Sequence, residues 1–230
     1  TAARVVGETF RVLLSTAMVA IAGGAPPAVP TEDVHPDVPR VVASTEDRIA
    51  DALLVCIGRW GLAKTTVEDI AREAGVSRAT VYRLYPGGKS AISEAAAVAD
   101  VQRLVGELQA GLPGVDRRPE RLAGALRLAA TFFAEHEALN FLRQHEPAEF
   151  ERLVRLDRLD LLLTATGELV GPVLRPVFDT DADARAAAIW LGRLVASHVV
   201  NPSPTLDLTD PVQAHEVVTT FVLPGLDPAA

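Results

Sequence analysis

Beyond residue 44, apolar residues recur every three or four positions along most of the chain, a pattern that predicts amphipathic helices. The first such run covers residues 45–60, where Thr45 and the acids after it open a helix and Gly61 ends it. Its apolar positions are Ile49, Ala52, Leu53, Cys56, Ile57 and Trp60. Because Cys56 lies on this apolar face with no motif around it, we expect a buried structural thiol rather than a nucleophile.

Two shorter helices follow, joined by a tight turn. Thr66 and Asp69 form a capping box that opens the first, and Gly75 can take the left-handed conformation that ends it. Ser77 caps the second, and Pro86 with the two glycines after it prevents continuation. Two short helices joined by a glycine turn predict a helix-turn-helix.

The remainder of the chain also reads as helical, without the alternation of a strand. The expected helices cover residues 90–111, 119–139, 147–171, 182–201 and 210–223. We therefore predict an all-α fold, with an N-terminal three-helix helix-turn-helix domain at 44–90 followed by a second helical domain at 91–230.

Residues 1–43 differ in pattern from the rest. An apolar run at 12–22, preceded by Arg4 and Arg11, is too short for a membrane span of about 20 residues. It fits either a secretory signal or an amphipathic helix packed against the body or a partner subunit, and we favour the helix. The proline-rich tract at 26–39 then predicts an extended linker.

The net charge of the whole chain argues against binding to nucleic acid, but the charge of its separate segments does not. The 230 residues are 49% apolar with a formal net charge of -8 and a pI of about 5.1, an acidic globular mixture. Residues 101–230 hold 12 basic and 18 acidic residues, which accounts for -6 of that charge. Between Ser77 and Lys89 there is no acid and the charge is +3. A single cysteine excludes an intrachain disulfide, so a reducing, cytoplasmic setting is the expectation.

The cationic second helix is the candidate DNA-reading element, because such a helix contacts base edges with its N-terminal residues. Arg78 can pair with guanine, and methyl groups of Ala79 and Thr80 can contact thymine. The candidate DNA-binding residues are Thr65, Thr66, Ser77, Arg78, Ala79, Thr80, Tyr82, Arg83, Tyr85 and Lys89. Among them Thr65, Thr66, Tyr82, Tyr85 and Lys89 would reach phosphates. The alternative for Tyr82 and Tyr85 is packing in the small core, and for Arg83 a solvated cation.

No catalytic or metal-binding constellation stands out. His136 and His215 are each followed by glutamate but lack the second histidine of a metalloprotease helix. The acids at 179–183 lack the glycine and final glutamate of a calcium loop and are expected to cap a helix. We predict no enzyme activity, no metal and no cofactor.

Residues 46–94, and above all 65–89, resemble the DNA-binding domain of the TetR family of bacterial transcriptional regulators. The resemblance implies an all-α homodimer, usually a repressor, that binds a palindromic DNA operator and is released by a small-molecule effector. Two features depart from the family pattern. Lys89 stands one residue later than usual after the aromatic-proline pair, and the segment before residue 44 is unusually long.

The same resemblance assigns roles to the second domain. Residues 182–201 and 210–223 would form a four-helix homodimer interface. Candidates to line the effector pocket are Phe132, Phe133, His136, Phe141 and Trp190. A small apolar effector is expected, and the acidity of this domain favours neutral or cationic molecules over anions.

The sequence also allows a second function. The chain could be a secreted or membrane-tethered helical interaction protein in which the helix-turn-helix is only a packing unit. Cleavage of the native protein between Ala22 and Ala25 would favour that alternative, whereas a retained segment in the cytoplasm would favour the regulator.

Overall fold

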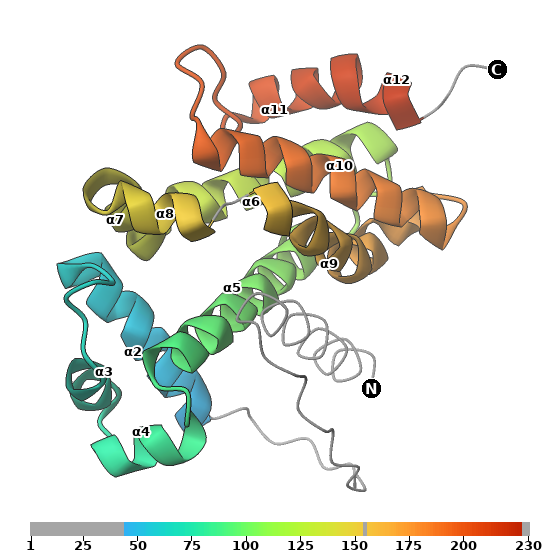
Figure 1. The fold of residues 1–230 in the computed structure, drawn as a ribbon. Coiled ribbons are helices and arrows are strands. Elements are labelled where there is room, and N and C mark those ends of the chain that lie inside the picture. The colour runs from blue at the N-terminus through green and yellow to red at the C-terminus, as the bar shows by residue number, and fades with distance from the viewer. Residues whose placement is uncertain (1–43, 154–155, 227–230) are drawn as a thin grey trace, which may run out of the picture.

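The computed structural model describes residues 44–153 and 156–226, and within these ranges it is helical with no strand (Figure 1). The predictions for residues 1–43 lie outside the described residues. The elements are α2 (Thr45–Trp60), α3 (Val67–Ala74), α4 (Arg78–Leu84), α5 (Lys89–Gly111), α6 (Arg118–Ala134), α7 (Glu137–His145), α8 (Pro147–Leu153), α9 (Leu156–Leu174), a 3-10 turn (Arg175–Val177), α10 (Asp181–Val200), α11 (Pro211–Val217), a π-helical turn (Val218–Val222) and α12 (Leu223–Leu226). The predicted all-α class is confirmed.

Helices α2, α3 and α4 form the small unit that we call the head, and local sequence sets its boundaries. The Thr66 hydroxyl accepts from the Asp69 amide at 3.2 Å, and the Asp69 carboxylate accepts from the Thr66 amide at 3.1 Å. Hydrogen bonds from Thr66 hold the pKa of the Asp69 carboxyl below its ordinary value. Gly75 takes the predicted left-handed conformation, with φ of 65°. The helix-turn-helix is therefore present as predicted, although Ser44 rather than Thr45 caps α2.

The head has its own hydrophobic core. Its fully buried side chains are Ile49, Leu53, Ile70, Val81 and Ile92. Cys56 is also fully buried, and desolvation raises the pKa of its thiol, which agrees with the predicted structural role. The cluster takes in Ile92 and Ala96 of α5, as well as residues of α7 and α8. Because α5 contributes to this core past residue 90, the head and body share an element instead of being joined by a free linker.

The body packs around the second half of α5. Leu104 and Leu108 of α5 join a large apolar cluster with α6, α9, α10 and α11. Buried Arg121 of α6 donates to the carbonyls of Val173 at 2.9 Å, Leu112 at 3.2 Å and Val115 at 2.7 Å. Figure 1 shows α5 running diagonally from the head to the body, with α10, α11 and α12 at the side remote from α3 and α4.

Two predicted long helices differ from the structure. The helix expected over 119–139 stops at Ala134, because His136 caps a new helix by accepting from the Leu139 amide at 3.2 Å. The helix expected over 147–171 is described as α8 and α9, on either side of residues 154–155, and α9 ends later than predicted because it continues through Pro172 to Leu174. A proline this close to a helix end removes few main-chain bonds, so it does not stop the helix. The division at His136 turns α7 toward α2, which it contacts.

Candidate nucleic-acid interface

The start of α4 presents its predicted base-reading residues outward. Ser77, Arg78 and Ala79 are exposed, Thr80 is half-buried, and Val81 anchors the helix in the head core. The Thr80 amide donates to the Ser77 hydroxyl at 3.0 Å, and the two hydroxyl oxygens lie 2.9 Å apart. The first turn of α4 is thus fixed by its own cap, with one face buried and the other open to a partner.

Arg78 is held by two groups from different parts of the head. Its Nη1 forms an ion pair with Oε1 of Glu68 on α3, and its guanidinium lies 5.4 Å from the centre of the Tyr82 ring. Tyr82 and then Glu68 raise the pKa of Arg78. Tyr82 is itself 41% exposed, so it lies on the surface rather than in the core. The structure therefore brings Arg78 and Tyr82 together as one surface feature.

The acids of α3 do not leave a bare negative patch beside this surface. Asp69 pairs with Arg72 at 3.1 Å, and Glu73 pairs with Arg59 at 2.9 Å. Glu68 pairs with Arg78, as described above. Each of the three carboxylates has an arginine partner, a neutralisation that the sequence did not reveal because two of the three partners lie on other helices.

Two predicted phosphate contacts have structural partners instead. The Thr65 side chain is only 2% exposed, and its hydroxyl donates to the Gly61 carbonyl at 2.6 Å. The Lys89 ammonium group donates to the carbonyls of Leu62 at 2.8 Å and Thr65 at 3.1 Å. The Gly61 carbonyl also accepts from the Thr65 amide at 3.2 Å, and Lys89 supplies donors to the Leu62 and Thr65 carbonyls of the loop between α2 and α3. The direct role of Thr65 and Lys89 is to hold this loop.

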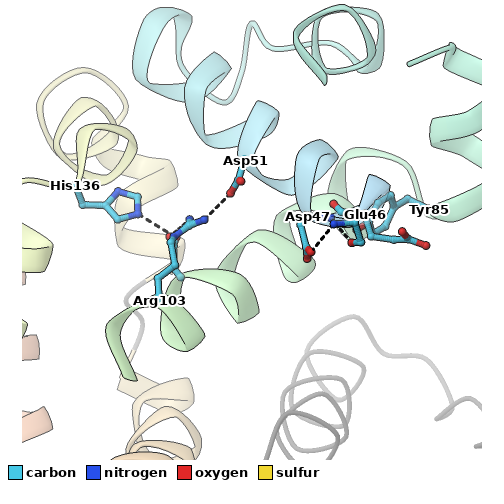
Figure 2. A network of polar contacts seen from close by, with 8 residues as sticks. Glu46, Asp47, Asp51, Tyr85, Arg103 and His136 are labelled. Carbon is cyan, nitrogen blue, oxygen red and sulfur yellow. Dashed lines mark hydrogen bonds and ion pairs between the residues drawn. The ribbon is translucent and has the colours of Figure 1, made fainter. Parts of the chain in front are cut away.

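The remaining candidates divide in the same way. Tyr85 packs against the head core, and its hydroxyl donates to the Glu46 carbonyl at 3.2 Å (Figure 2). Thr66 is exposed at the N-terminus of α3, where its hydroxyl also donates to Asp69 at 2.6 Å. Arg83 is exposed on α4. The outward-facing set is therefore Thr66, Ser77, Arg78, Ala79, Tyr82 and Arg83, with Thr80 half-buried beside it.

Glu146, which sequence reasoning did not single out, fixes the α2–α3 loop from the body side. Its carboxylate accepts from the Leu62 amide at 2.8 Å and from the Ala63 amide at 3.2 Å. Gly61 has φ of 86°, and a Cβ there would clash with Oε1 of Glu146. The lack of a side chain at Gly61 thus permits the close approach of Glu146 to this loop.

A second polar connection joins the head to the body through α5. Arg103 of α5 pairs with Asp51 of α2 and with Asp100, and Asp100 also contacts Nε2 of His136 at 2.9 Å (Figure 2). Partial burial lowers the pKa of Arg103, but Asp100 and Asp51 outweigh it and raise the pKa overall. These contacts link α2, α5 and His136, the N-cap residue of α7.

A cleft lined by described residues contains two of the five candidates for an effector pocket. A surface cleft of about 300 Å³ is lined by Leu54, Val55, Asp100, Arg103, Glu107, Phe132, Glu135, His136, Glu137 and Ala138. Phe132 and His136 are in it, whereas Phe133 packs edge-to-face on Phe132 with ring centres 5.3 Å apart. Because one helix ends at Ala134 and α7 begins at Glu137, Phe141 lies near Gly61 and packs against the His145 ring. Trp190 is 56% exposed on α10.

Within the described ranges, no helix has the length and apolar character to cross a membrane. The same residues contain no group of three or more histidine, cysteine, aspartate or glutamate side chains placed to hold a metal ion.

A glycine-turned helix pair with an exposed cationic second helix, mounted on a helical body, defines the class of helix-turn-helix regulators. The family model described as bacterial regulatory proteins, tetR family, matches residues 49–96. Residues 49–96 therefore form a DNA-binding domain of the TetR type.

The chain is similar in sequence to two regulators and in fold to a solved structure. An uncharacterized HTH-type transcriptional regulator of Mycobacterium tuberculosis, Rv2250c, is 42% identical over 65 residues, which are 27% of this chain and 34% of the relative. The chain thus spans about a third of that relative's length. A second regulator of that organism, Rv1255c, is 26% identical over 186 residues, 80% of this chain and 86% of the relative. The TetR family repressor AlkX from Dietzia sp. has a similar fold, with a TM-score of 0.61 at 21% identity over 78% of this chain and 96% of its own.

Proposed function

We propose that the protein is a ligand-responsive transcriptional repressor that binds a palindromic operator as a homodimer in the cytoplasm. The observation that carries this proposal is the acid-free, outward-facing start of α4, where Ser77, Arg78 and Ala79 are exposed above the buried anchor Val81. This geometry suits insertion of the helix into the major groove, with Arg78 at the base edges and Thr66, Tyr82 and Arg83 toward phosphates.

Homodimerisation would use residues 182–201 and 210–223, on the side of the body remote from the head. This region carries four large apolar side chains that are strongly exposed in the single chain: Trp190 (56%), Val200 (47%), Val212 (71%) and Phe221 (73%). Large apolar side chains exposed on neighbouring helices of one region are typical of protein interaction sites. We reassign Trp190 from the effector pocket to this interface.

The effector would act at the junction of head and body. Phe132 and His136 remain candidates for contacting it, because both line the cleft that also includes Leu54 of α2 and Arg103 of α5. Its carboxylates outnumber its basic groups, which disfavours an anionic effector and suits a small molecule that is mainly apolar. Movement of α5 would change the separation of the two recognition helices, and DNA and effector would weaken each other's binding reciprocally.

A titration of labelled DNA tests the proposal. Duplexes are first selected by the wild-type chain from a random library, and their affinity is compared with that of a scrambled duplex. Arg78→Ala should weaken the selected duplex by about tenfold or more, since a bidentate arginine–guanine pair discriminates by about 1–3 kcal/mol. Tyr82→Ala should weaken it as well.

The matched control is Arg117→Ala, which removes the same charge from an exposed position at the start of α6. It should leave the affinity for the selected duplex nearly unchanged. Failure of the wild-type chain to select any sequence, or affinity unaffected by both head substitutions, would overturn the proposed function.

A further inference from the structure

We infer that Glu68 is a specificity-determining residue of the DNA-binding surface, because it orients Arg78 toward a neutral guanine edge and disfavours its use on phosphates. This inference rests on the proposed function. It assigns a role in sequence discrimination to an acid on α3, the helix that precedes the recognition helix.

The geometry singles out Glu68 among the acids of α3. Its Oε1 contacts Nη1 of Arg78 across the Gly75 turn, and Arg78 also lies over the Tyr82 ring one helical turn further along. Asp69 is engaged with Thr66 and Arg72, and Glu73 with Arg59. In the part of the chain that the structure describes, Glu68 is therefore the α3 carboxylate that pairs with the recognition helix.

This pair is placed to orient Arg78 without hiding it. The side chains of Arg78 and Glu68 are 60% and 47% exposed, and exposed ion pairs of this kind are weak. A guanidinium has five N–H donors in a planar fork. Glu68 contacts Nη1 and Tyr82 lies beside the group, and the N–H donors of the fork that Glu68 does not contact can turn to the two acceptors O6 and N7 of guanine.

Glu68 also distinguishes the two kinds of DNA group that Arg78 can meet. A phosphate is an anion and is repelled by the nearby carboxylate, whereas the guanine edge is neutral. Charges separated by less than the Debye length, about 8 Å at physiological salt, still act on each other. The carboxylate therefore weakens non-specific phosphate contacts of Arg78 more than it weakens the guanine contact.

Glu68→Gln removes the charge and keeps the size of the side chain. The full-length variant is compared with the wild type by fluorescence anisotropy on the wild-type-selected duplex and on a scrambled duplex, at a series of salt concentrations. We expect the scrambled duplex to bind about threefold tighter with a steeper salt dependence, since Arg78 becomes free to contact phosphate. The ratio of selected to scrambled affinity should fall about fivefold or more.

Glu73→Gln is the matched control, because it removes the same charge from the same helix where the carboxylate pairs with Arg59 instead. It should change the affinity for both duplexes by the same factor and leave their ratio intact. In an Arg78→Ala background, Glu68→Gln should no longer change the ratio. Melting temperatures of both glutamine variants equal to that of the wild type would show that the head remains folded.

An unchanged ratio in Glu68→Gln, while the wild type does select a sequence, overturns this inference and leaves the proposed function standing. An equal fall in Glu73→Gln also overturns it, because the effect would then belong to net charge. Absence of any selected duplex for the wild type contradicts the proposed function, and the inference falls with it.

Discussion

At the scale of single residues, the polar side chains around the helix-turn-helix divide into those that face outward and those that hold the chain. Lys89 and Arg83 are both cations near the recognition helix, and their sequence positions suggest similar roles. The structure separates them, because Lys89 donates to the Leu62 and Thr65 carbonyls whereas Arg83 is exposed. Charge alone therefore does not identify a phosphate contact.

This division predicts opposite effects of two similar substitutions. Lys89→Met leaves the two loop carbonyls without their donor, and an unsatisfied buried acceptor costs about 1–3 kcal/mol. Because these groups are only partly buried, we expect a loss of unfolding free energy near the lower end of that range, measured by urea denaturation. Arg83→Met should leave the unfolding free energy unchanged and weaken DNA binding. Equal stability of the two variants would contradict the structural role of Lys89.

At the scale of elements, the head is held by its own caps and by contacts from the body. The caps were predictable, since Thr66 and Asp69, Gly75, and Ser77 and Thr80 act within a few residues of each other. The contact of Glu146 with the α2–α3 loop was not, because it spans more than 80 residues and depends on how α7 folds back. His136 was missed as a cap because serine, threonine, aspartate and asparagine are the residues preferred there.

The candidate site, too, could be predicted from the sequence only where it depends on neighbouring residues. The exposed start of α4 followed from the helix-turn-helix pattern, since the N-terminal residues of the second helix, Arg78 among them, face the partner. The pairing of Arg78 with Glu68 required the angle between α3 and α4. The effector candidates were chosen by residue type alone, so Trp190 and Phe132 could not be told apart until their surroundings were known.

The loop contact predicts contrasting effects of two glycine substitutions. Gly61→Ala forces an L side chain into φ of 86° and displaces Glu146, so we expect the unfolding free energy to fall by about 1–3 kcal/mol. Gly106→Ala, in the middle of α5 with open space around the new methyl group, should raise it by about 0.5–1 kcal/mol. Thermal or urea unfolding measures both. Tolerance of alanine at Gly61 would refute the close approach described here.

At the scale of the whole molecule, the head and the exposed apolar surface lie at opposite ends of α5 (Figure 1). Helix α5 contributes to both hydrophobic cores, and Arg103 ties it to α2. A change at the junction cleft can therefore reach the recognition helix through a continuous set of packed elements. Two such chains, joined through their exposed apolar surfaces, would present two recognition helices to one duplex.

The proposed interface predicts that a single charge disrupts assembly. Phe221 is 73% exposed in the single chain, so Phe221→Glu should fold normally but place a charge in the apolar contact and shift the protein from dimer to monomer. Sedimentation velocity measures this shift. Gln109→Glu, which adds the same charge at an exposed position of α5, should remain dimeric. A Phe221→Glu variant that sediments as the wild type would place the interface elsewhere.

Two recognition helices of one homodimer would read one duplex, so the spacing of the half-sites decides whether both can bind. The wild-type chain is titrated against its selected palindrome and against versions with base pairs inserted between the half-sites. Recognition helices on one face of DNA must match half-sites about one helical turn, 34–36 Å, apart or a multiple of it. We predict two chains per duplex and a sharp loss of affinity when about half a helical turn is inserted. Equal affinity at every spacing would contradict the account.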